Sequence, residues 1–162
     1  MSQTLLVLHG PNLNLLGRRR PEIYGSRTLA DVNDEILRAC EHRGFDAIIE
    51  QRNGEGELID LLHRHAVGDP TSPGRVLGVI LNPGAYAHHG YALRDAIESC
   101  EAPVIEVHIS NIQGRGDEFR TQMVTASVCQ GVIMGLGTLS YAVAVDAMRR
   151  YVDMSATMIG HR

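Results

Sequence analysis

The chain has 162 residues, a hydrophobic content of 44% and a formal net charge of -4 at pH 7. Its length suits one domain with its own hydrophobic core. A pI near 6.0 argues against nucleic-acid binding. There is no apolar run of about eighteen residues and no basic stretch ahead of an apolar N-terminal core, so we expect neither a membrane span nor a signal peptide.

Cysteine and lysine restrict the chemistry further. Cys40, Cys100 and Cys129 are an odd number without the spacing of a metal site, so we expect reduced thiols in a cytoplasmic protein. Lysine and arginine together number 15, and every one is an arginine. The absence of lysine from the sequence excludes a lysine imine, a pyridoxal phosphate anchor and a phosphate-loop lysine.

Apolar runs and helical patterns alternate along the chain. We expect strands at about 4–9, 45–51, 76–81, 103–109 and 131–135. We expect one helix after Thr28 and others at about 57–67, 88–97 and 138–152. The first helix is the best defined, because Thr28 and Asp31 form a capping-box pattern and Gly44 is typical of a helix end. Its predicted buried stripe is Leu29, Val32, Ile36 and Leu37.

Strands that alternate with helices predict a single α/β domain over residues 1–162, with a parallel sheet covered by helices on both faces. The simplest arrangement is a flavodoxin-like five-stranded sheet with strand order 2-1-3-4-5, whose ligand crevice lies beyond the carboxyl ends of strands one and three. Polar residues follow three of the expected strands: Asn12, Asn82 and the segment 108–110. We therefore expect a site at this edge.

Glu106 and His108 lie two residues apart in an otherwise apolar strand. Alternation along a strand directs both side chains to the same face. A carboxylate beside an imidazole fixes its tautomer, raises its pKa and makes it a proton donor near neutral pH. The alternative is a structural histidine held by a hydrogen bond.

The segment from Leu8 to Gly25 is predicted to be a long loop, because glycines and prolines interrupt it. Long loops in compact domains often form lids or binding loops. This one holds three consecutive arginines, including Arg19 and Arg20, and ends near Tyr24. The alternative is a solvated basic loop.

Four motifs follow one another along the chain. They are Gly10–Asn14 with residues 16–17 and 19–25, Asn53 with residues 55–60, Asn82–Tyr86 with His88 and residues 93–95, and Glu106–Asn111 with residues 118–120. In this order and at these separations they resemble the type II 3-dehydroquinate dehydratases (type II dehydroquinases) along nearly the full chain.

The resemblance implies trans-dehydration of 3-dehydroquinate to 3-dehydroshikimate through an enolate, without metal, imine or cofactor, in the shikimate pathway or in quinate breakdown. By the same resemblance Tyr24 is the base and Arg19 the cation that lowers its pKa. Asn12 orients a water toward the enolate oxygen. His108 is the acid and Glu106 its orienting partner.

Substrate-binding positions carry over in the same way. Asn82 and the backbone amides of Ile109 and Ser110 match the family's carboxylate site. His88, Arg120 and Asp95 from a neighbouring subunit match the groups that hold the ring hydroxyls. The family also implies a homo-oligomer, a dodecamer of four trimers. The histidine pairs 88/89 and 63/65 lack a third ligand at suitable spacing, so we expect no metal.

The chain departs from the family pattern at several places. His9 replaces the usual asparagine, Arg20 stands where glutamate is usual, and Gly54 where histidine is frequent. The segment 113–117 is one residue longer, so Arg115 is not assigned a role.

Two other classes of function remain open at this stage. One is a divergent, inactive relative kept as a binding or assembly protein. The other is a flavodoxin-like nucleotide or phosphate binder, although no glycine-rich fingerprint follows the first strand.

Overall fold

The computed structural model describes residues 3–18, 26–69, 72–116 and 118–159. Within these residues five parallel strands form one sheet with the order β2-β1-β3-β4-β5. The strands are β1 (Thr4–His9), β2 (Asp46–Gln51), β3 (Gly78–Asn82), β4 (Val104–His108) and β5 (Gly131–Met134). The flavodoxin-like arrangement predicted from the sequence is therefore confirmed.

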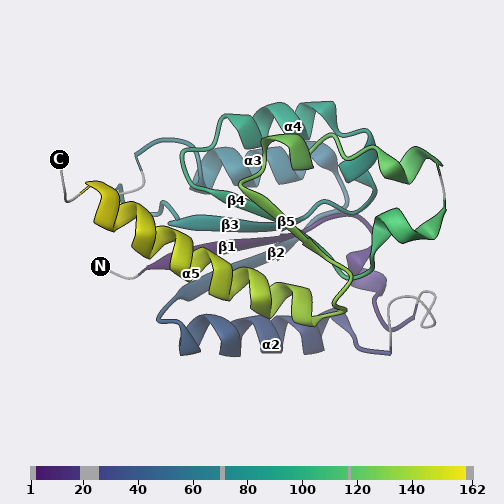
Figure 1. The fold of residues 1–162 in the computed structure, drawn as a ribbon, viewed down its shortest axis with the longest axis horizontal. Coiled ribbons are helices and arrows are strands. Elements are labelled where there is room, and N and C mark those ends of the chain that lie inside the picture. Colours follow the sequence, from purple (N-terminus) through teal and green to yellow (C-terminus); the bar gives the residue numbers. More distant parts are fainter. Residues whose placement is uncertain (1–2, 19–25, 70–71, 117, 160–162) are drawn as a thin grey trace.

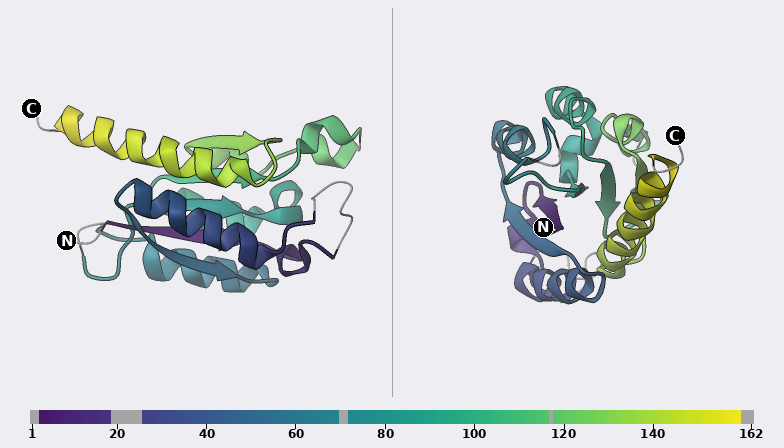
Figure 2. Two further views of the ribbon diagram at one scale, coloured as in Figure 1. Left: turned by 90° about the horizontal axis from the view of Figure 1, so that it is seen from below. Right: turned by 90° about the vertical axis from the view of Figure 1, so that its left-hand side faces the viewer.

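Helices cover both faces of the sheet (Figures 1 and 2). Helices α2 (Leu29–His42) and α5 (Leu139–Ile159) pack together on one face. Helices α3 (Glu55–His65) and α4 (Tyr91–Glu98) pack together on the other. Each pair closes a separate apolar core, and β1 supplies both: Leu5 and Val7 face one core, while Leu6 and Leu8 face the other. Burial on both faces explains the uninterrupted apolar run in this strand.

Helix α2 begins where its sequence predicts, but the face that it buries is narrower than the predicted apolar stripe. Asp31 Oδ2 accepts from the Thr28 backbone N–H at 2.8 Å, and Thr28 Oγ1 accepts from the Asp31 backbone N–H at 3.2 Å. Val32, Ile36 and Cys40 are buried. The expected burial of Leu37 is wrong, since it is 46% exposed. Each helical residue turns about 100°, so Leu37 points away from the line through Val32 and Ile36.

Several boundaries differ from those expected. Helix α3 begins at Glu55, and the Gly54 backbone N–H at its start donates to Glu57 Oε2 at 3.0 Å. The expected helix from 88 is divided: a short 3₁₀ helix (Gly84–His88) precedes α4. Further 3₁₀ helices were not predicted; they are Leu13–Leu15, Ile112–Arg115, Glu118–Thr121 and Ala126–Val128.

The loops after β1 and β3 lie in direct contact at the carboxyl edge of the sheet. The Gly10 backbone N–H donates to the Asn82 carbonyl oxygen at 2.7 Å. A Cβ at Gly10 would lie 2.7 Å from the carbonyl carbon and oxygen of Pro83. Only glycine allows this approach, which brings two expected site segments together.

No helix in the described part of the chain is long and apolar enough to span a lipid bilayer.

Candidate active site

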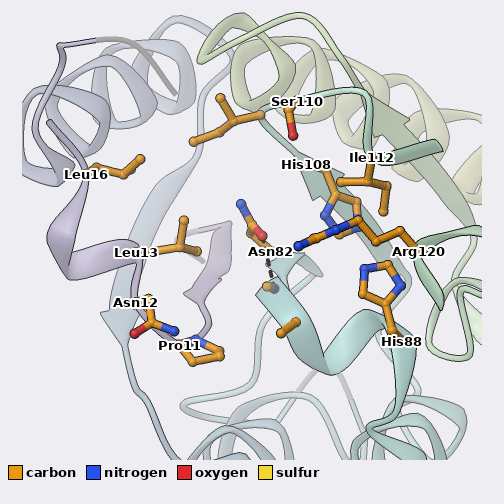
Figure 3. Close-up of a pocket in the computed structure, with 13 residues that line it drawn as sticks. Pro11, Asn12, Leu13, Leu16, Asn82, His88, His108, Ser110, Ile112 and Arg120 are labelled. Carbon is orange, nitrogen blue, oxygen red and sulfur yellow. Dashed lines mark hydrogen bonds between the residues drawn. The ribbon is translucent and has the colours of Figure 1, made fainter. Parts of the chain in front are cut away.

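A pocket opens at the carboxyl edge of the sheet, where the segments after β1, β3 and β4 meet (Figure 3). Its apolar wall includes Leu13, Leu16, Ile109 and Ile112. Its polar side chains are those of Asn12, Asn82, His88, His108, Ser110 and Arg120. The sequence predicted a site at this edge, and these six predicted residues surround one cavity.

The pairing expected for Glu106 and His108 is present. His108 Nε2 lies 2.7 Å from Glu106 Oε1, and the two residues are only 4% and 0% exposed. An ionised carboxylate accepts only, so the Nε2 atom carries the proton in this bond. The atom that gains or loses a proton is then Nδ1.

Glu106 has two further neighbours, which the sequence analysis did not identify. The Thr125 hydroxyl donates to Glu106 Oε2 at 2.7 Å, and the Cys129 thiol lies 3.7 Å from the same oxygen. Burial, followed by the charge of Glu106, raises the pKa of Cys129 far above its usual range, so this thiol stays protonated as a donor. Both oxygens of this carboxylate thus face donors, which offsets the cost of burying it. These contacts join residues 19 and 23 positions apart, so no local sequence pattern predicts them.

Asn82 connects the pocket to a second buried network. Its Nδ2 atom donates to the Tyr141 hydroxyl at 2.9 Å, and its Oδ1 atom accepts from the Gly84 backbone N–H at 3.2 Å. The Tyr141 oxygen lies 3.0 Å from His9 Nδ1, and His9 Nε2 lies 2.9 Å from Asn33 Oδ1. His9 and Tyr141 are 0% and 1% exposed.

Burial controls the protonation of both rings in this network. It lowers the pKa of His9 from 6.5 to about 4, against a smaller raising effect from the Asn33 hydrogen bond. It raises the pKa of Tyr141 well above its usual range, against a lowering effect from Asn82. Both rings are therefore neutral at pH 7. The sequence marked His9 only as an unusual residue and did not indicate Tyr141 or Asn33.

His88 and Arg120 approach the pocket from two 3₁₀ helices (Figure 3). His88 Nδ1 lies 2.7 Å from the Gln122 carbonyl oxygen, which accepts only, so Nδ1 is the donor. Asp95 is different. It lies on α4 with its side chain 75% exposed and ion-paired to Arg94 at 3.1 Å, and it is not among the described residues that line the cavity.

Asn12 has a left-handed backbone conformation, with φ of 67°. Its backbone N–H donates to Asn53 Oδ1 at 3.0 Å, and Gln51 Nε2 donates to the same oxygen at 2.9 Å. The Asn53 carbonyl oxygen accepts from the Tyr86 hydroxyl at 2.8 Å. Asn53, from the second sequence motif, therefore holds the loop that carries Asn12 and ties it to the third motif.

Three predicted positions, Arg19, Arg20 and Tyr24, lie outside the described residues. Arg115 ends the 3₁₀ helix that begins at Ile112. In residues 3–18, 26–69, 72–116 and 118–159, no three His, Cys, Asp or Glu side chains gather as a metal site.

Comparison with known proteins gives consistent matches. The family model for dehydroquinase class II matches residues 3–149. A 3-dehydroquinate dehydratase from Halalkalibacterium halodurans is 47% identical over 90% of this chain and 95% of its own length. A 3-dehydroquinate dehydratase from Desulfitobacterium hafniense strain Y51 is 50% identical over 86% of this chain and 90% of its own length. The crystal structure of a type II dehydroquinase from Butyrivibrio crossotus superposes with a TM-score of 0.83 and 38% identity, covering 91% of this chain and 97% of the other.

Proposed function

The chain belongs to the class II dehydroquinase family, and we propose from this that it catalyses the trans-dehydration of 3-dehydroquinate to 3-dehydroshikimate. The observation that carries the proposal is the pocket in which Asn12, Asn82, His88, His108 and Arg120 converge at the carboxyl edge of the sheet. Fold alone would not identify a reaction. Here the donors and acids required by an anionic, hydroxylated substrate surround one cavity.

The reaction begins when a base removes a proton from the carbon beside the ketone, and the electron pair moves to the carbonyl oxygen to form an enolate. The enolate then collapses and expels the hydroxyl group at the adjacent carbon. His108, as an imidazolium, gives its Nδ1 proton to that group, which leaves as water. Glu106 holds the opposite side of the ring at 2.7 Å and fixes its orientation.

In this proposal Tyr24 is the base and Arg19 activates it. A phenol with a pKa of about 10 needs its pKa lowered by about three units to act near pH 7, which corresponds to roughly 4 kcal/mol. One arginine at about 4 Å supplies an interaction of that order at an effective dielectric constant near 20. Asn12 orients the water that donates to the enolate oxygen.

Binding of the substrate anion relies on local groups, because the protein as a whole is acidic. In the proposal Asn82 and the backbone amides of Ile109 and Ser110 take the carboxylate. His88 and Arg120, together with Asp95 of a neighbouring subunit, hold the ring hydroxyls.

We also propose a cytoplasmic homo-oligomer of four trimers, with no cofactor. The three free thiols support a reducing compartment. The exposed position of Asp95, outside the cavity of its own chain, supports a contribution in trans. Biosynthesis of aromatic compounds and breakdown of quinate use the same reaction, so either pathway accommodates the enzyme.

A direct assay tests the proposal. Purified protein with 3-dehydroquinate should generate the ultraviolet absorbance of the conjugated enone product, without added metal or cofactor. Chelators should leave the rate unchanged. Borohydride with substrate should neither inactivate the enzyme nor add mass, because the chain has no lysine for an imine. Failure of the wild-type protein to form product would contradict the proposed reaction and favour a divergent, inactive relative.

A further inference from the structure

Four polar side chains form a continuous hydrogen-bonded row from the pocket into the core beneath α2 and α5. The row runs from Asn82 at the end of β3, through Tyr141 of α5 and His9 at the end of β1, to Asn33 of α2. Elements distant in the sequence therefore meet on the side of Asn82 that faces away from the cavity. None of the inner three residues lines the cavity among the described side chains.

The row has two self-consistent directions. In the first, Asn82 Nδ2 donates to Tyr141, the Tyr141 hydroxyl donates to His9 Nδ1, and His9 Nε2 donates to Asn33 Oδ1. In the second, both amides are flipped and all the donors become acceptors. Each direction uses the single hydroxyl hydrogen of Tyr141 and the single ring hydrogen of a neutral histidine once.

Gly84 selects between the two directions. Its backbone N–H lies 3.2 Å from Asn82 Oδ1 and can only donate. In the second direction this N–H would face the Asn82 amino group, and two donors would oppose each other. The first direction is therefore favoured, and it leaves the second hydrogen of Asn82 Nδ2 for an oxygen of a ligand.

We infer that His9 and Tyr141 are positioning residues: together with the Gly84 N–H, they hold the Asn82 amide so that it presents an N–H group, rather than its oxygen, to the substrate carboxylate. This inference rests on the proposed function. The His9 imidazole is 0% exposed, and α2 provides its acceptor, Asn33, at 2.9 Å. The loss of affinity on flipping would be large, because an amide oxygen repels a carboxylate.

The direction of the row is measurable without any substitution or substrate. In ¹⁵N NMR spectra of the ligand-free protein at pH 7, His9 should show the neutral tautomer with its hydrogen on Nε2. The burial that lowers its pKa to about 4 keeps it neutral at this pH. A His9 ring with its hydrogen on Nδ1, or with both nitrogens protonated, would contradict the inferred direction.

The effect on substrate is tested with Tyr141→Phe, which removes one oxygen. With 3-dehydroquinate we expect KM to rise roughly tenfold while kcat changes by less than about threefold, since the loss falls on binding common to ground and transition states. The matched control is Tyr151→Phe, the same change at the other tyrosine of α5, which should leave KM unchanged. Melting temperatures of both variants report whether the fold is retained.

Different results would contradict the proposed function and the positioning inference. A wild-type enzyme that forms no product would overturn the proposed function and, with it, the role toward substrate. An active wild-type enzyme whose Tyr141→Phe variant keeps its KM, or loses only kcat, would overturn the positioning inference alone.

Discussion

Glu106 is a buried carboxylate, and both of its oxygens have hydrogen-bond partners. Its side chain is 0% exposed, yet Oε1 meets the His108 ring and Oε2 meets the Thr125 hydroxyl, each at 2.7 Å. A buried charge without such partners would cost several kcal/mol. The donors on Oε2 also fix the plane of the carboxylate, so Oε1 holds His108 in one orientation toward the cavity.

The acid role of His108 leads to a first prediction. His108→Ala should reduce turnover by at least about 10²-fold, because general acid catalysis contributes that much or more. The fold should survive, since His108 borders the pocket and the Thr125 hydroxyl and Cys129 thiol still face Glu106 Oε2. Steady-state rates and thermal melting measure the two effects. His63→Ala, an exposed histidine of α3, is the control. Near-normal turnover in His108→Ala would remove this residue from the mechanism.

The base belongs to the segment outside the described residues and remains a prediction from the sequence. Tyr24→Phe removes only an oxygen, yet it should lower kcat by about 10²–10⁴-fold with little change in melting temperature. Arg19→Lys keeps the charge but loses the planar guanidinium, so it should also be severely impaired. Arg20→Lys, the same change at the neighbouring arginine, provides the comparison and should be tolerated better. A Tyr24→Phe variant with most of the wild-type rate would require a different base.

At the scale of elements, the site depends on close contact between the loops after β1 and β3. Gly10→Ala should lower both stability and activity, because its Cβ would meet the Pro83 and Asn82 backbone, which cannot move aside as a side chain would. We expect a loss of about 1–3 kcal/mol in the free energy of unfolding, the usual cost of overpacking.

Gly56→Ala is the matched control for this prediction. Gly56 lies in α3, and nothing is within 4 Å of a Cβ built there. Alanine should therefore stabilise the helix, by up to about 1 kcal/mol. Urea unfolding measures both variants. If Gly10→Ala unfolds at the same urea concentration as wild type and retains its KM, the contact between the loops is not needed for the site.

The elements were also the scale at which the sequence was most informative. Apolar runs such as Leu5–Leu8 predicted strands within two residues of those observed, and their alternation with helices predicted the strand order. The pairing of Glu106 with His108 followed from strand alternation alone. The contacts of Thr125, Tyr141 and Asn33 could not be predicted, because they join residues 19 to 132 positions apart. Leu37 was misplaced because hydrophobicity alone does not fix the width of a buried helix face.

At the scale of the whole molecule, the contribution proposed for Asp95 to the site of a neighbouring subunit leads to a further prediction. Asp95→Asn should raise KM for 3-dehydroquinate, although its side chain is 75% exposed and Asp95 is not among the described residues that line the cavity of its own chain. The control is Glu98→Gln, which removes the charge of a second carboxylate that pairs with Arg94. Light scattering should show an oligomer under assay conditions. A fully active monomer, or an unchanged KM in Asp95→Asn, would contradict the contribution in trans.

The buried His9 makes the stability of the whole fold depend on pH. Its pKa is about 4 in the folded protein and 6.5 without burial, so between these values the unfolded chain binds more protons. Stability therefore rises with pH across this window and is lost progressively as the pH falls below 6.5. For this one group the loss should reach about 2 kcal/mol at pH 5. Comparison with His9→Asn, which cannot titrate, isolates it: urea unfolding at fixed protein concentration should show wild type losing that much more than the variant between pH 8 and pH 5. Equal losses in the two proteins would mean that His9 binds a proton in the folded protein as readily as in the unfolded chain. A protonated His9 donates from both ring nitrogens, so it could not accept from the Tyr141 hydroxyl in the row that holds Asn82.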